Sequence, residues 1–357
     1  MRVAVLHAMA LSLWRDRAAL ALAFLLPAVI YAIFALVFSS AAGGQMKIRL
    51  AVFAQENEIS QELLAGLRGA REISSVINAA SAAESEAAVR DGRADAGVAI
   101  AFDEDREAPV IVFYSDATRE GAAIVAENVM RQLAPSDEAV AADVSRRVIN
   151  PVNTAAPMQA YFAAGVAMLF LLLSGFQSAL TLFEERDSGV LERVAAGPAG
   201  IAAVIDGKFM FIVLQGILQT GIILLTAAVF FNVSLGYAPD ALFLAAFAAA
   251  IAAAGLALGL TTLCRSRAQA HASGTVISLI SAALGGSMAP KFLMPAHMQT
   301  IGAATPNAIG IDAFASALWK GGGVAAALSP AAILILMGLG GLVVAHLAAR
   351  ISLRPAA

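Results

Sequence analysis

Six charged side chains surround Val190 and Leu191 in the stretch FEERDSGVLERVAAGPAGIAAVIDG, residues 183–207. They are Glu184, Glu185, Arg186, Asp187, Glu192 and Arg193. Charges beside an apolar pair are typical of a short amphipathic helix that lies along a membrane surface and offers its leucine to a partner's pocket. Gly189 and Pro198 limit this helix to about two turns. An ordinary solvated loop is the alternative, because surface loops are commonly charged.

The sequence does not predict nucleotide hydrolysis by the chain itself. A P-loop needs Gly-x-x-x-x-Gly-Lys-Ser/Thr after a strand, because its backbone amides hold the phosphates. Gly207-Lys208 comes closest, but position 202 is Ala202 and no strand is predicted before it. The four histidines are scattered, and the single Cys264 excludes an internal disulfide and a multi-cysteine metal site. We therefore expect no catalytic residue, metal or cofactor in this chain.

The composition predicts an integral membrane protein. Hydrophobic residues make up 60% and charged residues 14%, against an apolar share of about 45–50% in soluble domains. The charged stretch lies between residues 158–183 and 209–231, which contain no charge over 26 and 23 positions. A membrane-spanning helix needs about 20 apolar residues. The charged stretch is therefore expected at a membrane face.

Six apolar segments predict six transmembrane helices, at residues 18–38, 158–183, 209–231, 241–264, 268–289 and about 325–349. The first follows an interfacial lead-in, so that residues 1–39 form one unit. A cleaved signal peptide is the alternative for this segment, but its 21 uncharged residues exceed the roughly 7–15 of a signal peptide's apolar region. Residues 158–357 contain the other five segments.

Residues 40–157 differ in composition and predict a soluble domain inserted between the first two spans. They carry 11 Lys/Arg and 18 Asp/Glu residues, a net charge of −7. Strands are predicted at 48–54, 73–78, 96–101 and 110–114, and helices at 60–70, 83–91 and from Thr118 toward Arg147. This alternation indicates an α/β or α+β layer. Without a phosphate or calcium loop, a binding or spacer role is favoured over catalysis.

The charge distribution predicts the orientation, because cytoplasmic loops carry an excess of Lys and Arg. With the N-terminus inside, ten such residues of the short segments lie in the cytoplasm and only Lys291 and Lys320 lie outside. The ten are Arg2, Arg15, Arg17, Arg186, Arg193, Lys208, Arg265, Arg267, Arg350 and Arg354. Both termini and the charged stretch are then cytoplasmic, and the inserted domain is extracytoplasmic.

Residues 290–323 predict a pair of short helices on the outer face. Met294, Met298 and Ile301 share one helical face, Thr305-Pro306-Asn307 is a break, and residues 309–319 form a second amphipathic piece. Such a segment is either re-entrant or interfacial. Trp319 beside Lys320 is typical of an interfacial anchor.

Polar side chains at helical spacing occur within the second and third spans. They are Ser174, Gln177, Ser178 and Thr181 in the second, and Gln215 and Gln219 in the third. Such residues often form hydrogen bonds between membrane helices, and a lining for the substrate path is the second interpretation. Gly255 and Gly259 in the fourth span indicate close helix packing.

Three segments, FEERDSGVLERVAAGPAG, GGSMAPKFLMP and ATPNAIGIDAF, together with the layout of spans, resemble the permease subunit of a type-2 ATP-binding-cassette (ABC-2) exporter. The resemblance covers essentially the whole chain. It implies that residues 184–200 contain a coupling helix, which inserts into a cytoplasmic ATPase, and that the permease works as a dimer.

The resemblance implies which residues of this chain correspond to the two patterns of the family. The acidic-Gly-Leu-Glu-Arg pattern of the coupling helix corresponds to Glu184, Glu185, Arg186, Gly189, Leu191, Glu192 and Arg193, and the outer-face pattern to Pro290, Pro295, Thr305, Pro306 and Asn307. The family commonly has a bulky aromatic residue soon after Thr-Pro-Asn, whereas this chain has Ala308-Ile309-Gly310. The shape of the exit region is therefore not predicted.

The function that these expectations describe is export through a bacterial inner membrane. ATP and Mg²⁺ would be bound by the partner ATPase, and the cargo would be lipid-like, amphipathic or drug-like. Other expected partners are a second copy or a similar permease, a periplasmic adaptor and membrane lipids, but no nucleic acid. The first span and the outer segment are expected at or beside the dimer interface.

Two other classes of function fit the sequence less well. An ion-driven secondary transporter needs ionisable groups at mid-membrane, whereas the spans offer only His271 and His346, both near span ends. A membrane sensor with the external domain as receptor needs a cytoplasmic output domain, which the sequence does not predict.

Overall fold

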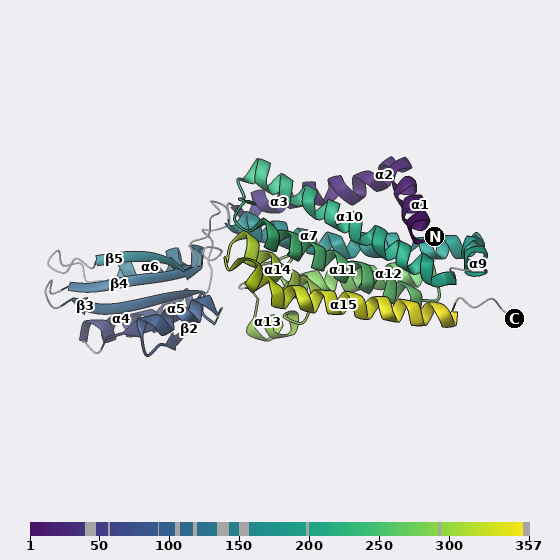
Figure 1. The fold of residues 1–357 in the computed structure, drawn as a ribbon. Helices are drawn as coiled ribbons and strands as arrows, with labels where there is room; N and C mark the ends of the chain where they lie inside the picture. Colours follow the sequence, from purple (N-terminus) through teal and green to yellow (C-terminus); the bar gives the residue numbers. More distant parts are fainter. Residues whose placement is uncertain are drawn as a thin grey trace. The chain divides into compact units, whose positions relative to one another are not determined.

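The computed structural model forms two compact units, one made of residues 1–37 and 153–357 and the other of residues 38–152 (Figure 1). It describes residues 1–39, 48–55, 58–91, 93–103, 108–116, 120–133, 143–149, 157–197, 200–291 and 294–352. The first unit is helical and the second contains the sheet.

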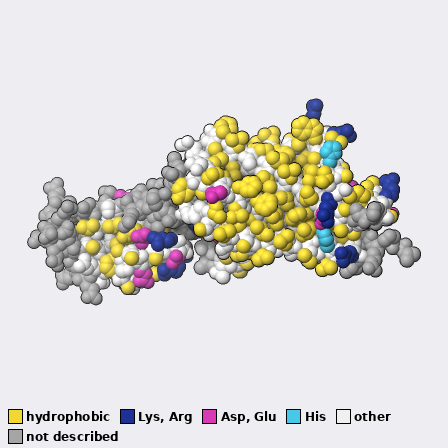
Figure 2. Space-filling model, viewed as in Figure 1, with side chains coloured by type: hydrophobic (Ala, Val, Ile, Leu, Met, Phe, Trp, Pro, Cys, Tyr) yellow, Lys and Arg dark blue, Asp and Glu magenta, His cyan; other side chains and the backbone are white. Residues whose placement is uncertain are grey.

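The helical unit begins with α1 (Arg2–Arg15), α2 (Arg17–Leu20), the π-helical turn η1 (Ala21–Leu25) and α3 (Leu26–Ser39). After the inserted unit it continues with α7 (Pro157–Ala179), α8 (Thr181–Asp187), α9 (Val190–Ala195), α10 (Gly200–Phe231), α11 (Pro239–Leu263), α12 (Arg267–Gly285), α13 (Ala296–Gly302), α14 (Pro306–Leu318) and α15 (Gly323–Ser352). Hydrophobic side chains cover most of its visible face (Figure 2).

Among the described residues, five helical segments are long and apolar enough to cross a membrane: Arg17–Val37, Met158–Asp187, Gly200–Phe231, Pro239–Leu263 and Gly323–Arg350. The predicted span at 268–289 corresponds to α12, which is helical over 19 residues but is not among the five. Gln269, His271 and Thr275 lower its hydropathy. The count of six spans is therefore not confirmed.

Helices α11 and α15 approach each other through glycines. A Cβ atom added at Gly255 would collide with the carbonyl oxygen of Gly338, and one at Gly259 would lie 2.7 Å from that of Gly341. Only a residue without a side chain allows this contact between backbones. The close packing predicted for Gly255 and Gly259 is confirmed, and the structure identifies α15 as the partner helix.

The second unit contains a five-stranded sheet in the order β2-β1-β3-β4-β5. Its strands are β1 (Ile48–Ala54), β2 (Ile73–Asn78), β3 (Ala96–Asp103), β4 (Ala108–Asp116) and β5 (Asp143–Ile149), and its helices are α4 (Glu58–Gly69), α5 (Ala82–Arg90) and α6 (Glu120–Leu133). Only the β3–β4 pairing is antiparallel among the pairings of these strands.

The alternation of side chains along the strands builds a core on each face of the sheet. Val98 packs with Leu67 of α4 and Met130 of α6, whereas its neighbour Ala99 packs with Val89 of α5. The first four strands and the first two helices lie where they were predicted, to within a few residues.

The long helix predicted from Thr118 toward Arg147 is wrong at its second half. Helix α6 ends at Leu133, and Asp143–Ile149 forms β5, which pairs in parallel with β4. The local sequence DVSRRVI contains three β-branched residues, and pairing with β4 satisfies its backbone groups. Tertiary pairing therefore overrides the helical pattern.

Candidate coupling site and polar residues of the spans

The charged stretch folds into two short helices, α8 and α9, which meet at Ser188 and Gly189. Gly189 has φ +68, in the left-handed region, and precedes the first residue of α9. A glycine adopts this conformation without steric cost. Gly189 therefore sets the angle at which α9 leaves α8.

The polar side of this segment is exposed. Glu184, Arg186, Asp187, Glu192 and Arg193 are exposed, and so is Val190, at 39%. Leu191 is only 3% exposed and belongs to a core cluster with Val204 and Ile205 of α10. The expectation that Leu191 enters a partner's pocket is therefore wrong for this structure. Among the described side chains of α8 and α9, Val190 is the large apolar one that is exposed.

Lys208 of α10 contacts the buried side of α8. Its side chain is completely buried, and its Nζ atom lies 2.7 Å from Oε1 of Glu185 and 2.6 Å from Oγ1 of Thr181. Nζ also lies 4.0 Å from the sulfur atom of Met9 in α1. An ammonium group without solvent requires such partners, because its desolvation otherwise costs several kcal/mol.

Asp206, two residues before Lys208 on α10, joins three helices. Its carboxylate lies 2.7 Å from Nε of Arg2 in α1 and 3.0 Å from Nε2 of His346 in α15. Gly207 permits the approach of α1, since a Cβ there would lie 2.6 Å from the Cβ of Val5. These contacts hold α1 against α10.

Arg267 at the start of α12 forms an ion pair with Glu184, with Nη2 2.9 Å from Oε1. Both side chains are exposed, so this pair contributes little stability by itself. It nevertheless joins α8 to α12. Lys and Arg side chains gather toward the end of the helical unit where the N-terminus and α9 lie (Figure 2).

The ion-pair roles of Lys208, Asp206 and Arg2 were not predicted from the sequence. Lys208 was expected only as a cytoplasmic charge beside the third span, and the helix that contains it begins earlier, at Gly200. The signal in the sequence was a lysine directly before the uncharged run of residues 209–231, and it is the ninth residue of α10. Its partner, Glu185, could not be identified without the fold.

All six candidate path residues form hydrogen bonds to another helix, and four of them form two pairs between α7 and α10. Ser174 donates to Oε1 of Gln219 and Ser178 donates to Oε1 of Gln215, each at 2.8 Å. Gln219 also donates to the carbonyl of Ala23, at 2.8 Å, and both glutamines are buried. These contacts favour the helix-packing interpretation for all four residues.

The other two candidates differ. Thr181 accepts the Lys208 hydrogen bond, so it belongs to the coupling segment. Gln177 is exposed, with its Nε2 atom 3.2 Å from Nε2 of His271 in α12. Of the six, Gln177 is thus the side chain that remains accessible to a passing molecule.

The predicted helix pair in residues 290–323 is present as α13 and α14. Thr305 caps α14, because its Oγ1 atom accepts a hydrogen bond from the backbone amide of Ala308 at 3.2 Å. Pro306 occupies the first turn of α14. Asn307 is fully buried, accepts from Ser281 at 2.6 Å and donates to Ser287 at 2.8 Å. The Thr-Pro-Asn sequence therefore begins one helix and ties it to α12.

The buried character of α14 supports the re-entrant interpretation over the interfacial one. Trp319, directly after α14, is 2% exposed and its ring centroid lies 5.7 Å from that of Tyr161 in α7. Trp319 is therefore packed inside the unit, and its interpretation as an interfacial anchor is wrong. Pro290 is buried, whereas Pro295 is exposed.

The helical unit, with its apolar spans, buried polar contacts and charged end, defines a multi-pass α-helical membrane protein. A family model described as ABC-2 family transporter protein matches residues 17–347. The chain belongs to this family and is an ABC-2 type permease. The comparison with curated proteins gave no significant match.

Proposed function

We propose that this permease is the membrane subunit of an exporter and that the α8–α9 segment couples it to a separate cytoplasmic ATPase. One observation carries the proposal: the segment exposes Val190 among charged side chains while its opposite side is fixed to the membrane helices. A partner that grips the exposed side would therefore move the helices behind it.

The path of this movement follows from the contacts. Leu180 alone separates α8 from α7, and Glu185 on α8 is paired with the buried Lys208 of α10. Leu191 adds an apolar contact between α9 and α10. A displacement of α9 is thus transmitted to the second and third candidate spans together, because separating Glu185 from Lys208 would leave a buried charge unpaired.

The orientation that suits this function places both termini and the α8–α9 segment in the cytoplasm and the sheet unit outside. The excess of Lys and Arg in the short segments on that side supports it. It requires α12 to cross the membrane as a sixth span, in which Ser278 and Ser281 are buried against other helices. The membrane would be a bacterial inner membrane.

ATP and Mg²⁺ would be bound by the ATPase. Two permease chains would be needed, because two nucleotide-binding domains close on each other in ATP-binding-cassette transporters. The second chain is either another copy or a similar permease. A periplasmic adaptor is a further candidate partner for the sheet unit, and the cargo would be a lipid-like, amphipathic or drug-like molecule.

Affinity purification from native membranes, followed by mass measurement of the intact complex in lipid particles, tests this function. We expect two permease chains with two ATPase chains. An active assembly of one permease with one ATPase, or a permease that transports without any ATPase, would contradict the proposal. The second result would instead favour an ion-driven carrier.

A further inference from the structure

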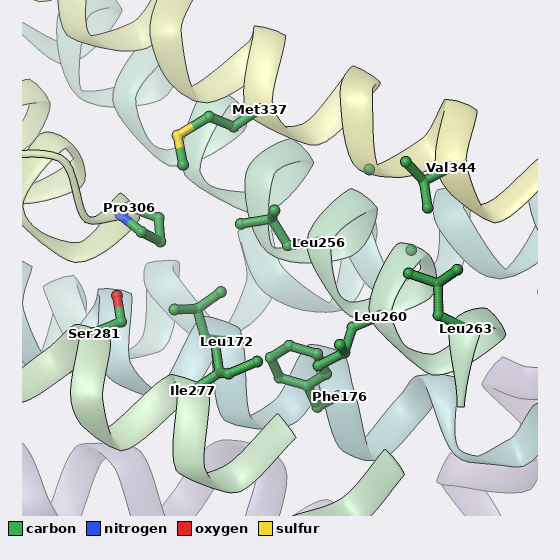
Figure 3. Close-up of a pocket in the computed structure, with 12 residues that line it drawn as sticks. Leu172, Phe176, Leu256, Leu260, Leu263, Ile277, Ser281, Pro306, Met337 and Val344 are labelled. Carbon is green, nitrogen blue, oxygen red and sulfur yellow. The ribbon is translucent and has the colours of Figure 1, made fainter. Parts of the chain in front are cut away.

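An apolar groove runs between α12 and α15, with α7 and α11 beneath it (Figure 3). Its volume is about 410 Å³, within the roughly 300–1,000 Å³ typical of small-molecule sites. Phe176, Leu260 and Ile277 point into it, with Leu263 and Val344 toward one end and Ser281 toward the other.

The lining offers nothing to a polar ligand. Among the described residues around the groove, Ser281 provides the only side-chain hydroxyl, and this hydroxyl already donates to Asn307 at 2.6 Å. Water needs two or more polar partners to occupy such a space. Three of the five bordering helices, α7, α11 and α15, are candidate membrane spans, whereas α12 and α14 are not. The open side of the groove therefore faces hydrocarbon rather than water.

The groove has a basic end. Gly255 packs against Gly338 and Gly259 against Gly341, so α11 and α15 run in the same direction. Arg265 follows Leu263 and Arg350 follows Val344, and both arginines are exposed. The two positive charges therefore lie beyond the same end of the groove, at the end of the bundle that also carries the α8–α9 segment.

We propose that this groove binds an acyl chain of an anionic membrane lipid, whose head group lies at the end marked by Arg265 and Arg350. The apolar lining accepts a hydrocarbon chain without desolvating a polar group, and exposed guanidinium groups attract a phosphate. This inference goes beyond the proposed function, because it holds whatever energises transport.

Photo-cross-linking in lipid nanodiscs tests the site. The probe is phosphatidylglycerol with a diazirine on one acyl chain, added as a minor component to phosphatidylcholine discs that contain the full chain. We expect cross-links at Leu260 and Leu263. Ile277→Trp fills the groove and should abolish them, whereas Val276→Trp, an exposed neighbour outside the lining, should leave them intact.

A second pair of variants keeps the test valid if one protein folds poorly. Val344→Trp should also remove the cross-links, and Val343→Trp should not, since Val343 is exposed but does not line the groove. Equal labelling in filled and control variants would overturn the proposal, because it would indicate unspecific lipid around the protein. A cross-link between two permease chains through Ile277 would overturn it as well, since a second copy would then cover the groove.

The head group is tested separately. Phosphatidylcholine with the same diazirine chain should label Leu263 less than phosphatidylglycerol does, and the double variant Arg265→Gln/Arg350→Gln should remove this difference. Equal labelling of the original chain by both probes would overturn the anionic part of the assignment.

Discussion

The Nζ atom of Lys208 lies 2.7 Å from Oε1 of Glu185 and has no exposed surface, although its partner is 28% exposed. This pair joins the surface that a partner can reach to the interior of the helical unit. Glu185→Ala would leave the lysine buried without a counter-charge. We expect the unfolding free energy to fall by about 3 kcal/mol, measured by thermal or denaturant unfolding in detergent.

The matched control removes both charges. Lys208→Met/Glu185→Ala has no buried ion and keeps most of the side-chain volume, so its stability should recover most of the loss. If the double variant is as unstable as Glu185→Ala, the loss comes from packing rather than from the unpaired charge. The permeases would be compared at the same pH and salt concentration.

Leu191 and Val190 are neighbours with opposite environments, at 3% and 39% exposure. Leu191→Ala should lower the unfolding free energy by about 3 kcal/mol because it empties space in the core cluster. Val190→Ala should change it by only about 0.5 kcal/mol. Equal effects of the two substitutions would show that α9 does not pack as described.

The glycine contact between α11 and α15 predicts that two nearby glycines of α15 respond very differently to replacement by alanine. Gly338→Ala places a methyl group against the backbone of Ile251 and should cost about 1–3 kcal/mol. Gly340→Ala, two residues further, meets nothing within 4 Å and should be neutral or slightly stabilising. Thermal unfolding of the two variants compares them, and a stable Gly338→Ala protein would contradict the close approach.

Much of the fold could be predicted because it depends on local pattern. Uncharged runs located the long helices, and period-two alternation located β1 and β2 to the residue. The rest depends on contacts that are distant in sequence. The strand β5 exists because β4 lies beside it, Trp319 is buried because Tyr161 meets it, and Leu191 turns inward because α10 covers it. The local sequence around each of these residues does not identify the distant partner that it contacts.

The predicted orientation can be checked by labelling with a membrane-impermeant maleimide. Cys264 is replaced by Ala first, because its free thiol could react with the label. Ala83→Cys, exposed on α5, should label in sealed cells, and Ser188→Cys, exposed between α8 and α9, should label only after lysis. The reverse pattern would contradict the orientation.

The coupling role of the α8–α9 segment is tested most directly by the ATPase activity that the permease elicits from its co-purifying ATPase. Val190→Asp changes an exposed side chain, so the permease should fold and purify as before. A carboxylate cannot enter an apolar cleft without a cost of several kcal/mol, as a rough estimate, so stimulation of the ATPase should be lost. A folded Val190→Asp permease that stimulates its ATPase as fully as the original chain would contradict this mechanism.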